Sequence, residues 1–153
     1  MLAAREVAKW TNRFAVTRDG RRVTTYDSVQ RPADPGSFTL DGRRYALPGS
    51  IWDDRLTLLD EHAAVAAVAD RAGSGWTVTA GGQTYHLRRT AFWGGSYQLD
   101  AGDLPIGTVR RNGRWQRGFD LDLPGLPTQL QIFMLALVVA RWDKRIANRA
   151  VRL

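Results

Sequence analysis

The segment Leu126–Arg145, LPTQLQIFMLALVVARWDKR, holds nine consecutive apolar residues from Ile132 to Ala140 in a chain otherwise rich in arginine and turns. A transmembrane helix needs about 20 predominantly apolar residues to cross roughly 30 Å of hydrocarbon. The uncharged stretch covers only 128–140, and three of its residues are threonine or glutamine. We therefore expect the segment to be the core of a folded domain, with membrane insertion or peripheral anchoring as the alternative.

The residues around the apolar run predict a helix. Thr128, after Pro127, can serve as an N-cap, and Gln131 stands three residues further on, as in a capping box. From 130 to 140 every face of the helix is apolar, whereas its continuation carries charges in every turn. A helix that is apolar all round must be enclosed on all sides. We predict a buried core helix over 128–147, enclosed by a sheet, with a basic half that leaves the core.

The region 14–123 has the pattern of short strands separated by turns. Runs rich in β-formers lie on both sides of Asp19-Gly20, Asp41-Gly42 and Asn112-Gly113. These dipeptides suit a type I′ hairpin because glycine accepts positive φ. Turn signals recur about every ten residues, which predicts an all-β sandwich or barrel. The alanine-rich stretch 61–72 fits either a strand or, by propensity, a helix.

A weak internal repeat places a tyrosine two residues before a leucine three times. Residues two apart on a strand lie on the same face, so each pair would present an aromatic and an aliphatic side chain to a common core. By the same alternation His86 should face outward, as a structural or solvated residue. The repeated pairs are Tyr45 and Leu47, Tyr85 and Leu87, and Tyr97 and Leu99.

Four stretches of the chain resemble the tubby C-terminal-like superfamily, which includes phospholipid scramblases and plant LURP-one-related proteins. The stretches are DGRRYAL, GGQTYHL, YQLDAGDLPIGTV and DLDLPGLPTQLQIFMLALVVARW. The resemblance covers most of the chain from about Phe14, and its motifs are structural. It implies a mainly β fold, a closed antiparallel β-barrel of about twelve strands around a central hydrophobic C-terminal α-helix.

We expect a single domain over 1–153, because a chain of this length can bury one compact core. Within it, 14–123 would supply the strands and 128–147 the buried helix. The segment 1–13 would form either a cap over the open end of the barrel or a short amphipathic helix on anionic lipid. We favour the cap, because about a dozen residues make a marginal helix.

The most distinctive polar feature is a set of arginine pairs beside turns. Adjacent strand residues point to opposite faces, so one arginine of each pair would be aimed into the barrel unless the pairs lie at strand ends. Pairs that share one rim would form a basic ring able to bind phosphates through forked guanidinium contacts. The alternative is that these arginines are solvated residues beside turns and bind no ligand. The candidates are Arg21, Arg22, Arg43, Arg44, Arg88, Arg89, Arg110 and Arg111, with Arg114 across the Asn112-Gly113 turn.

The formal net charge of +7 favours anionic partners such as phospholipid head groups or nucleic acid. The resemblance also implies phosphoinositide binding through basic residues, without assigning positions. Six tryptophans could stack bases in a nucleic-acid site. Their even spread along the chain suits core packing better. We therefore prefer an anionic phospholipid surface over nucleic acid as partner.

Signals for catalysis are missing from the sequence. The chain has no cysteine, no P-loop and no dinucleotide fingerprint. Its carboxylate groups, Asp120 with Asp122 and the cluster Asp53, Asp54, Asp60 and Glu61 with His62, fit partners of the arginines better than a metal site. We expect no metal and no cofactor.

No secretory signal is recognisable at the start of the chain, so we expect a cytoplasmic protein, peripheral at the inner membrane face. The leading hypothesis is a non-enzymatic binding or scaffold protein that recognises phospholipid or phosphoinositide head groups. The alternatives are a nucleic-acid-binding module and an enzyme whose site is not readable from sequence.

Overall fold

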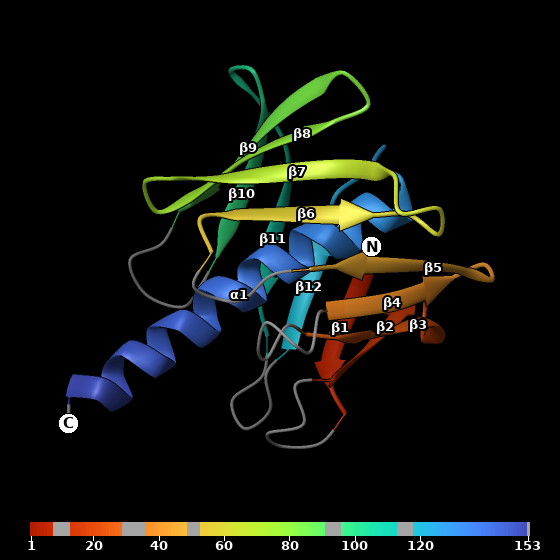
Figure 1. Cartoon of the computed structure of the whole chain (residues 1–153), viewed down its shortest axis with the longest axis horizontal. Coiled ribbons are helices and arrows are strands. Elements are labelled where there is room, and N and C mark those ends of the chain that lie inside the picture. The colour runs from red at the N-terminus through yellow and green to blue at the C-terminus, as the bar shows by residue number, and fades with distance from the viewer. Residues whose placement is uncertain (8–12, 29–35, 49–52, 91–95, 113–117, 153) are drawn as a thin grey trace.

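The computed structural model describes residues 1–7, 13–28, 36–48, 53–90, 96–112 and 118–152, with only the path of the helix for 141–152. These residues form a closed barrel of antiparallel strands with a helix running through it (Figure 1). The strands are β1 (Leu2–Glu6), β2 (Arg13–Arg18), β3 (Arg21–Asp27), β4 (Gly36–Leu40), β5 (Arg43–Leu47), β6 (Arg55–Leu59), β7 (Val65–Ala72), β8 (Gly75–Ala80), β9 (Gln83–Arg89), β10 (Tyr97–Ala101), β11 (Leu104–Arg111) and β12 (Gly118–Asp122), and the helix is α1 (Thr128–Arg152). The predicted closed barrel of twelve strands around a C-terminal helix is confirmed.

Each strand pairs with the next along the chain, and β1 closes the barrel between β12 and β2. Odd-numbered strands therefore all run in one direction and even-numbered strands return. The odd-numbered strands and α1 all begin at the same end of the barrel, which we call the entry end. We call the opposite end the exit end. In Figure 1 the turns after β4 and β6 mark the entry end on the right, and the last turns of α1 extend from the exit end at lower left.

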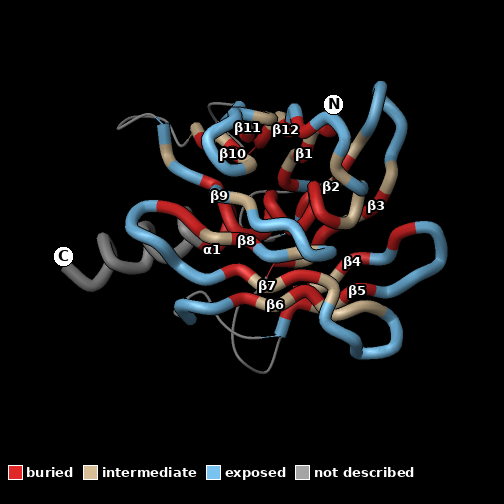
Figure 2. Tube along the Cα trace, turned by 90° about the horizontal axis from the view of Figure 1, so that it is seen from above, coloured by how far each residue is buried: buried red, intermediate tan, exposed pale blue. Residues whose placement is uncertain are grey.

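The apolar run of α1 is the centre of the core. Every residue from Leu130 to Ala140 is buried, and most of these side chains have no exposed surface. Buried residues occupy the middle of the strands and exposed ones the turns (Figure 2). Burial of about ten such side chains contributes roughly 15–30 kcal/mol before chain entropy is subtracted. The prediction that the barrel encloses this helix is correct.

Strand burial follows the period of two that the sequence indicated. In the tyrosine–leucine repeat, Tyr45 and Tyr97 are buried with all three leucines, while Tyr85 is only partly buried. Aromatic rings continue this inner layer across neighbouring strands, since Phe38 lies 5.0 Å from Tyr45 in a stacked arrangement. His86 is exposed, as expected.

Two of the predicted turns have the expected backbone. Asp19 and Gly20 have φ of 52° and 77°, and Asp41 and Gly42 repeat these values. Positive φ at both central residues defines the type I′ turn, whose twist matches that of the flanking strands.

The third predicted turn, at Asn112-Gly113, is wrong. Arg111 lies opposite Phe119, and the Asn112 amide donates to the Gly118 carbonyl at 2.7 Å. This register of β11 and β12 does not fit a two-residue turn at Asn112-Gly113, and residues 113–117 lie outside the described part of the chain.

The N-terminal segment also differs from the expectation of a cap or short helix over 1–13. Leu2–Glu6 is strand β1, with Leu2, Ala4 and Glu6 buried in alternation, because an open edge on β12 and β2 is filled by this strand. The open choice over 61–72 is settled in favour of a strand, since Val65–Ala72 is β7.

The helix starts at Thr128 as predicted, but the capping box is wrong. Gln131 N donates to the Pro127 carbonyl, so Pro127 takes the cap position, and the Gln131 side chain donates to the Leu126 carbonyl at 2.8 Å. Thr128 Oγ1 instead accepts from Arg18 at 2.9 Å. At its other end α1 continues to Arg152, five residues beyond the expected limit of 147.

The hairpin of β4 and β5 is the least tightly paired part of the wall. Its strands share five registered pairs. Among the described residues, the hairpin joins β3 only through Asp27 and Ser37, and β6 only through Ala46 and Leu59. A side-chain bond from Thr24 to the Thr39 carbonyl spans the first of these seams. Opening of this hairpin therefore breaks few ladder bonds.

We predict that backbone amides of the β4–β5 hairpin exchange hydrogen faster than those of β8, which pairs with both neighbours over five residues each. Native-state hydrogen exchange followed by mass spectrometry measures this difference. Equal protection of the two regions would show that the sparse pairing does not lower the local opening free energy.

Replacement of Leu137 by alanine removes a side chain with no exposed surface and should destabilise the fold by about 2–5 kcal/mol. Val65, which is 62% exposed, provides the matched control, and its change to alanine should shift stability by less than about 0.5 kcal/mol. Urea unfolding of both variants compares them. A small effect of Leu137→Ala would contradict the enclosed helix.

Candidate functional surface

The structure divides the predicted arginine ring between the two ends of the barrel. Arg21 and Arg22 open β3, and Arg43 and Arg44 open β5, so these four lie at the entry end. The pairs of β9 and β11 end their strands and lie at the exit end. A single ring that contains all of them is therefore not formed. The exit-end members are Arg88, Arg89, Arg110 and Arg111, and Arg114 lies outside the described residues.

Each pair has one member on the inner face and one on the outer face, as expected. Directly opposed residues share a face. Arg43 lies opposite buried Leu40, so it is on the inner face at the mouth of the barrel. Arg44 lies opposite Thr39, on the outer face. Both arginines are exposed because the strand end carries them clear of the core.

The exit-end pairs take part in the structure of the wall. Arg88 Nε donates to Asp100 Oδ2 at 2.7 Å, and Gln98 Nε2 donates to the other carboxylate oxygen at 2.7 Å. Arg89 and Arg111 lie opposite the buried rings Tyr97 and Phe119 and are themselves partly buried. These arginines therefore act first as structural residues of the barrel wall.

Other arginines of the wall pair across strands with aspartate. Arg13 Nε donates to Asp27 Oδ1 and Arg55 Nε to Asp70 Oδ1, both at 2.7 Å and both in direct register. Opposed unlike charges on one sheet face each contribute roughly 0.2–1 kcal/mol. These pairs therefore belong to the structure of the outer wall.

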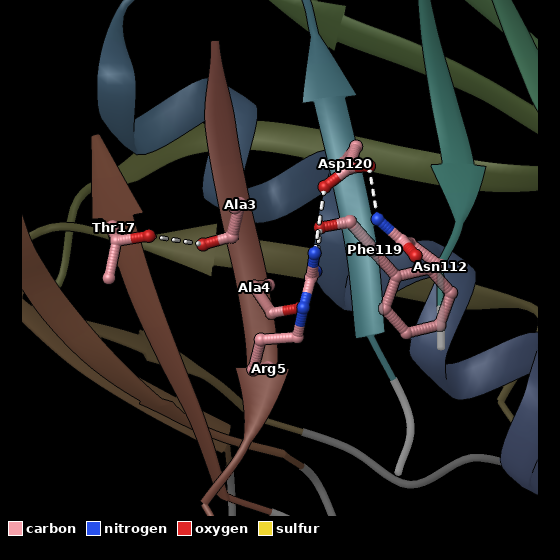
Figure 3. Close-up of polar contacts among 7 residues, drawn as sticks. All are labelled: Ala3, Ala4, Arg5, Thr17, Asn112, Phe119 and Asp120. Atoms are coloured by element: carbon pink, nitrogen blue, oxygen red, sulfur yellow. Dashed lines mark hydrogen bonds and ion pairs between the residues drawn. The ribbon is translucent and has the colours of Figure 1, made fainter. Parts of the chain in front are cut away.

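Figure 3 shows a third such contact, which fastens the closing strand β1. Arg5 donates to the carbonyls of Ala4 and Phe119 at 2.9 and 3.2 Å and pairs with Asp120 at 3.3 Å. Asn112 Nδ2 donates to the second Asp120 oxygen at 2.7 Å. Asp120, predicted as an arginine partner, thus links three parts of the wall.

At the entry end the arginines differ from those of the wall. Among the described residues, no carboxylate lies within ion-pair distance of Arg21, Arg22 or Arg44. Arg43 has only a long contact to Glu61, at 3.9 Å with both groups well exposed. Arg18, opposite Arg21, donates to Thr128 at the start of α1.

The hairpins β2–β3 and β4–β5 stand side by side, because β3 and β4 are neighbours in the barrel. Both carry the sequence Asp-Gly-Arg-Arg at their turns, in the same backbone conformation. We call the five arginines beside these two turns, Arg18, Arg21, Arg22, Arg43 and Arg44, the hairpin arginines. Two turn aspartates, Asp19 and Asp41, accompany them, so the surface retains an excess of positive charge.

The remaining predicted groups take separate partners. Asp60 Oδ1 accepts from the amides of His62 and Ala64 within its own turn, and Asp54 pairs with Arg71 at 3.5 Å. In the part of the chain that the structure describes, no three metal-ligating side chains converge.

Of the tryptophans expected in the core, Trp76 is buried. The side chains of Trp10, Trp52, Trp93, Trp115 and Trp142 lie outside the described residues.

Among the described residues no helix has the length and apolar character needed to cross a membrane. Comparison of the chain with models of protein families, with curated proteins and with solved structures finds no match. The resemblance to the tubby-like superfamily therefore stays a prediction from the motifs, while the barrel and its central helix agree with the fold it implies.

Asp100 supports a prediction on pH. The hydrogen bond from Gln98 and then the bond from Arg88 lower the pKa of Asp100 below its usual range. A carboxyl whose pKa is lower in the folded than in the unfolded state stabilises the fold above the unfolded pKa, about 3.9, and this contribution is lost as the pH falls through the folded pKa. Asp100→Asn should therefore lower the midpoint of thermal unfolding at pH 7 and reduce its fall below pH 4. If the unfolding midpoint of the variant falls below pH 4 as steeply as that of the unaltered protein, other carboxyl groups cause the loss of stability in acid.

Proposed function

We propose that this protein is a non-enzymatic binding or scaffold protein that recognises anionic phospholipid or phosphoinositide head groups through the hairpin arginines. The observation that carries the proposal is the absence of carboxylate partners for Arg21, Arg22 and Arg44 among the described residues, where most wall arginines have such partners. In this proposal the protein works in the cytoplasm, peripheral at the inner membrane face.

Physical reasons connect these arginines with phosphate. Guanidinium groups form forked hydrogen bonds with phosphate oxygens and stay charged at every physiological pH. Two adjacent type I′ hairpins place the paired arginines beside one another at one end of the barrel. Each arginine near an anionic bilayer contributes about 1 kcal/mol.

Arginines on the inner and outer faces of one hairpin would reach different phosphates. Arg43 points toward the mouth of the barrel and Arg44 away from it. Such a spread favours several head groups of a bilayer over one buried ligand.

The alternative, a nucleic-acid-binding module, draws on the same positive charge. Single-stranded nucleic acid is usually held by aromatic side chains beside a basic groove. On the described parts of the two hairpins the aromatic residues are Phe14, Tyr26, Phe38 and Tyr45, and all four are buried in the core. We therefore favour phospholipid for the hairpin arginines.

Replacement of Arg21, Arg22 and Arg44 by alanine should weaken binding to phosphatidylserine- or phosphoinositide-containing vesicles about a hundredfold, from about 1 kcal/mol per residue. The matched control changes Arg13, Arg55 and Arg88 to alanine, which removes the same charge from the ion-paired wall. Vesicle co-sedimentation at low and high salt measures both, with circular dichroism to verify folding.

Two outcomes would contradict this proposal. Equal losses in both variants would mean that only the net charge matters and not the hairpin arginines. Binding to oligonucleotides, with none to anionic vesicles, would favour the nucleic-acid module instead.

A further inference from the structure

We infer that the entry end is the membrane-facing end of the molecule, where Leu104 and Val65 enter the interfacial layer of an anionic bilayer on either side of the hairpin arginines. This inference rests on the proposed function and adds an orientation and an apolar contact to it. It starts from the large apolar side chains that the barrel leaves outside its core.

Three of the four large apolar residues that the described structure exposes lie at this end. Met1 is 72% exposed and precedes β1, Val65 is 62% exposed and opens β7, and Leu104 is 66% exposed and opens β11. All three strands begin at the entry end. The fourth residue, Val7, is 49% exposed and follows β1 at the exit end.

These residues flank the hairpin arginines around the barrel. Met1 adjoins the β2–β3 hairpin, because Leu2 lies opposite Arg18. Val65 follows the turn after β6, and β6 is the neighbour of β5 on the far side of the β4–β5 hairpin. Along the rim the order is thus Leu104, Met1, the two arginine hairpins and Val65.

Carboxylates at the same end define which part of the rim approaches lipid. Asp19 and Asp41 lie in the turns of the arginine hairpins, where the five hairpin arginines outnumber them. Elsewhere on the rim Asp60 and Glu61 precede Val65, Asp103 precedes Leu104, and Asp122 ends β12. The Asp60 carboxylate accepts hydrogen bonds from two backbone amides of its own turn, and Glu61 contacts Arg43 and His62. The favoured contact is therefore the arc centred on the arginines, with the apolar residues at its borders.

The combination of charge and apolar surface distinguishes a bilayer from other anions. Phosphate groups of nucleic acid or of a soluble head group would interact favourably with the arginines only. Leucine and valine gain when they leave water for the boundary between head groups and acyl chains. An exposed leucine beside a turn has a favourable place on a membrane that it lacks in water.

The chain has no cysteine, so single cysteines can carry a fluorescent probe without other changes. We would attach the environment-sensitive NBD group to Leu104→Cys, Val65→Cys and, as matched control, Val7→Cys. On phosphatidylserine vesicles the probes at 104 and 65 should brighten severalfold and be quenched by lipids that carry a doxyl group near the interface. The probe at position 7 should keep its spectrum in water.

The outcomes separate this inference from the proposed function. Vesicle binding with silent probes at 104 and 65 would overturn the inference and leave the proposed function standing. A response from position 7 alone would reverse the orientation and also overturn it. No binding to vesicles at all would remove the proposed function, and the inference with it.

A second measurement tests the apolar contribution by affinity. Leu104→Ser combined with Val65→Ser should weaken vesicle binding about tenfold and leave its salt dependence unchanged, since no charge is altered. Val7→Ser is the control and should bind as the unaltered protein does. Equal affinity of all three proteins would contradict insertion.

Discussion

The rest of the structure depends on one constraint, a helix that has no polar face. From Leu130 to Ala140 no face of α1 is polar enough to lie in water. This segment is therefore stable only where other parts of the protein cover it on every side. A flat sheet covers one face of a helix. A closed barrel covers every face, which explains why the twelve strands share one inward apolar layer and why the first strand must close the ring.

Closure has a consequence for the placement of charge. A barrel with an apolar interior leaves its outer wall and its two ends for polar groups. On the wall, arginine and aspartate face each other across strands and neutralise one another, as Arg13 and Asp27 do. At the entry end the arginines that follow the tight Asp-Gly turns lie opposite residues that carry no carboxylate: Thr17, Arg18, Thr39 and Leu40. The turns of the two hairpins thus carry five arginines beside two aspartates, Asp19 and Asp41, at one end of the barrel.

Much of the fold could be predicted because it is written in local patterns. The length of the apolar run excluded a comfortable membrane span, and the Asp-Gly dipeptides and the alternation of Tyr45 with Leu47 indicated turns and inner faces. The contact of the Thr128 side chain could not be predicted, since its partner Arg18 lies 110 positions earlier in the chain. The same holds for the place of β1 between β12 and β2, which is secured by contacts such as that of Arg5 with Asp120, 115 positions apart.

The division of the arginine pairs between the two ends had a signal that was available but incomplete. The pairs at 21 and 43 follow a turn, whereas those at 88 and 110 precede the next connection. In a sheet whose consecutive strands are neighbours, the number of strands between two pairs decides whether they lie at the same end. That number was uncertain, because the segment 65–72 fitted a strand or a helix by propensity. Among the described residues Arg21 and Arg44 have no carboxylate partner, which is a property of cross-strand register that no local pattern contains.

The most direct test of the central claim is the unfolding of a chain that ends at Pro127 and so lacks α1. If the helix is the core around which the strands close, this chain should lose the cooperative thermal transition and the near-ultraviolet circular dichroism of the intact protein. A monomeric, cooperatively unfolding barrel without the helix would contradict the account, because the twelve strands would then be stable around an empty or collapsed interior.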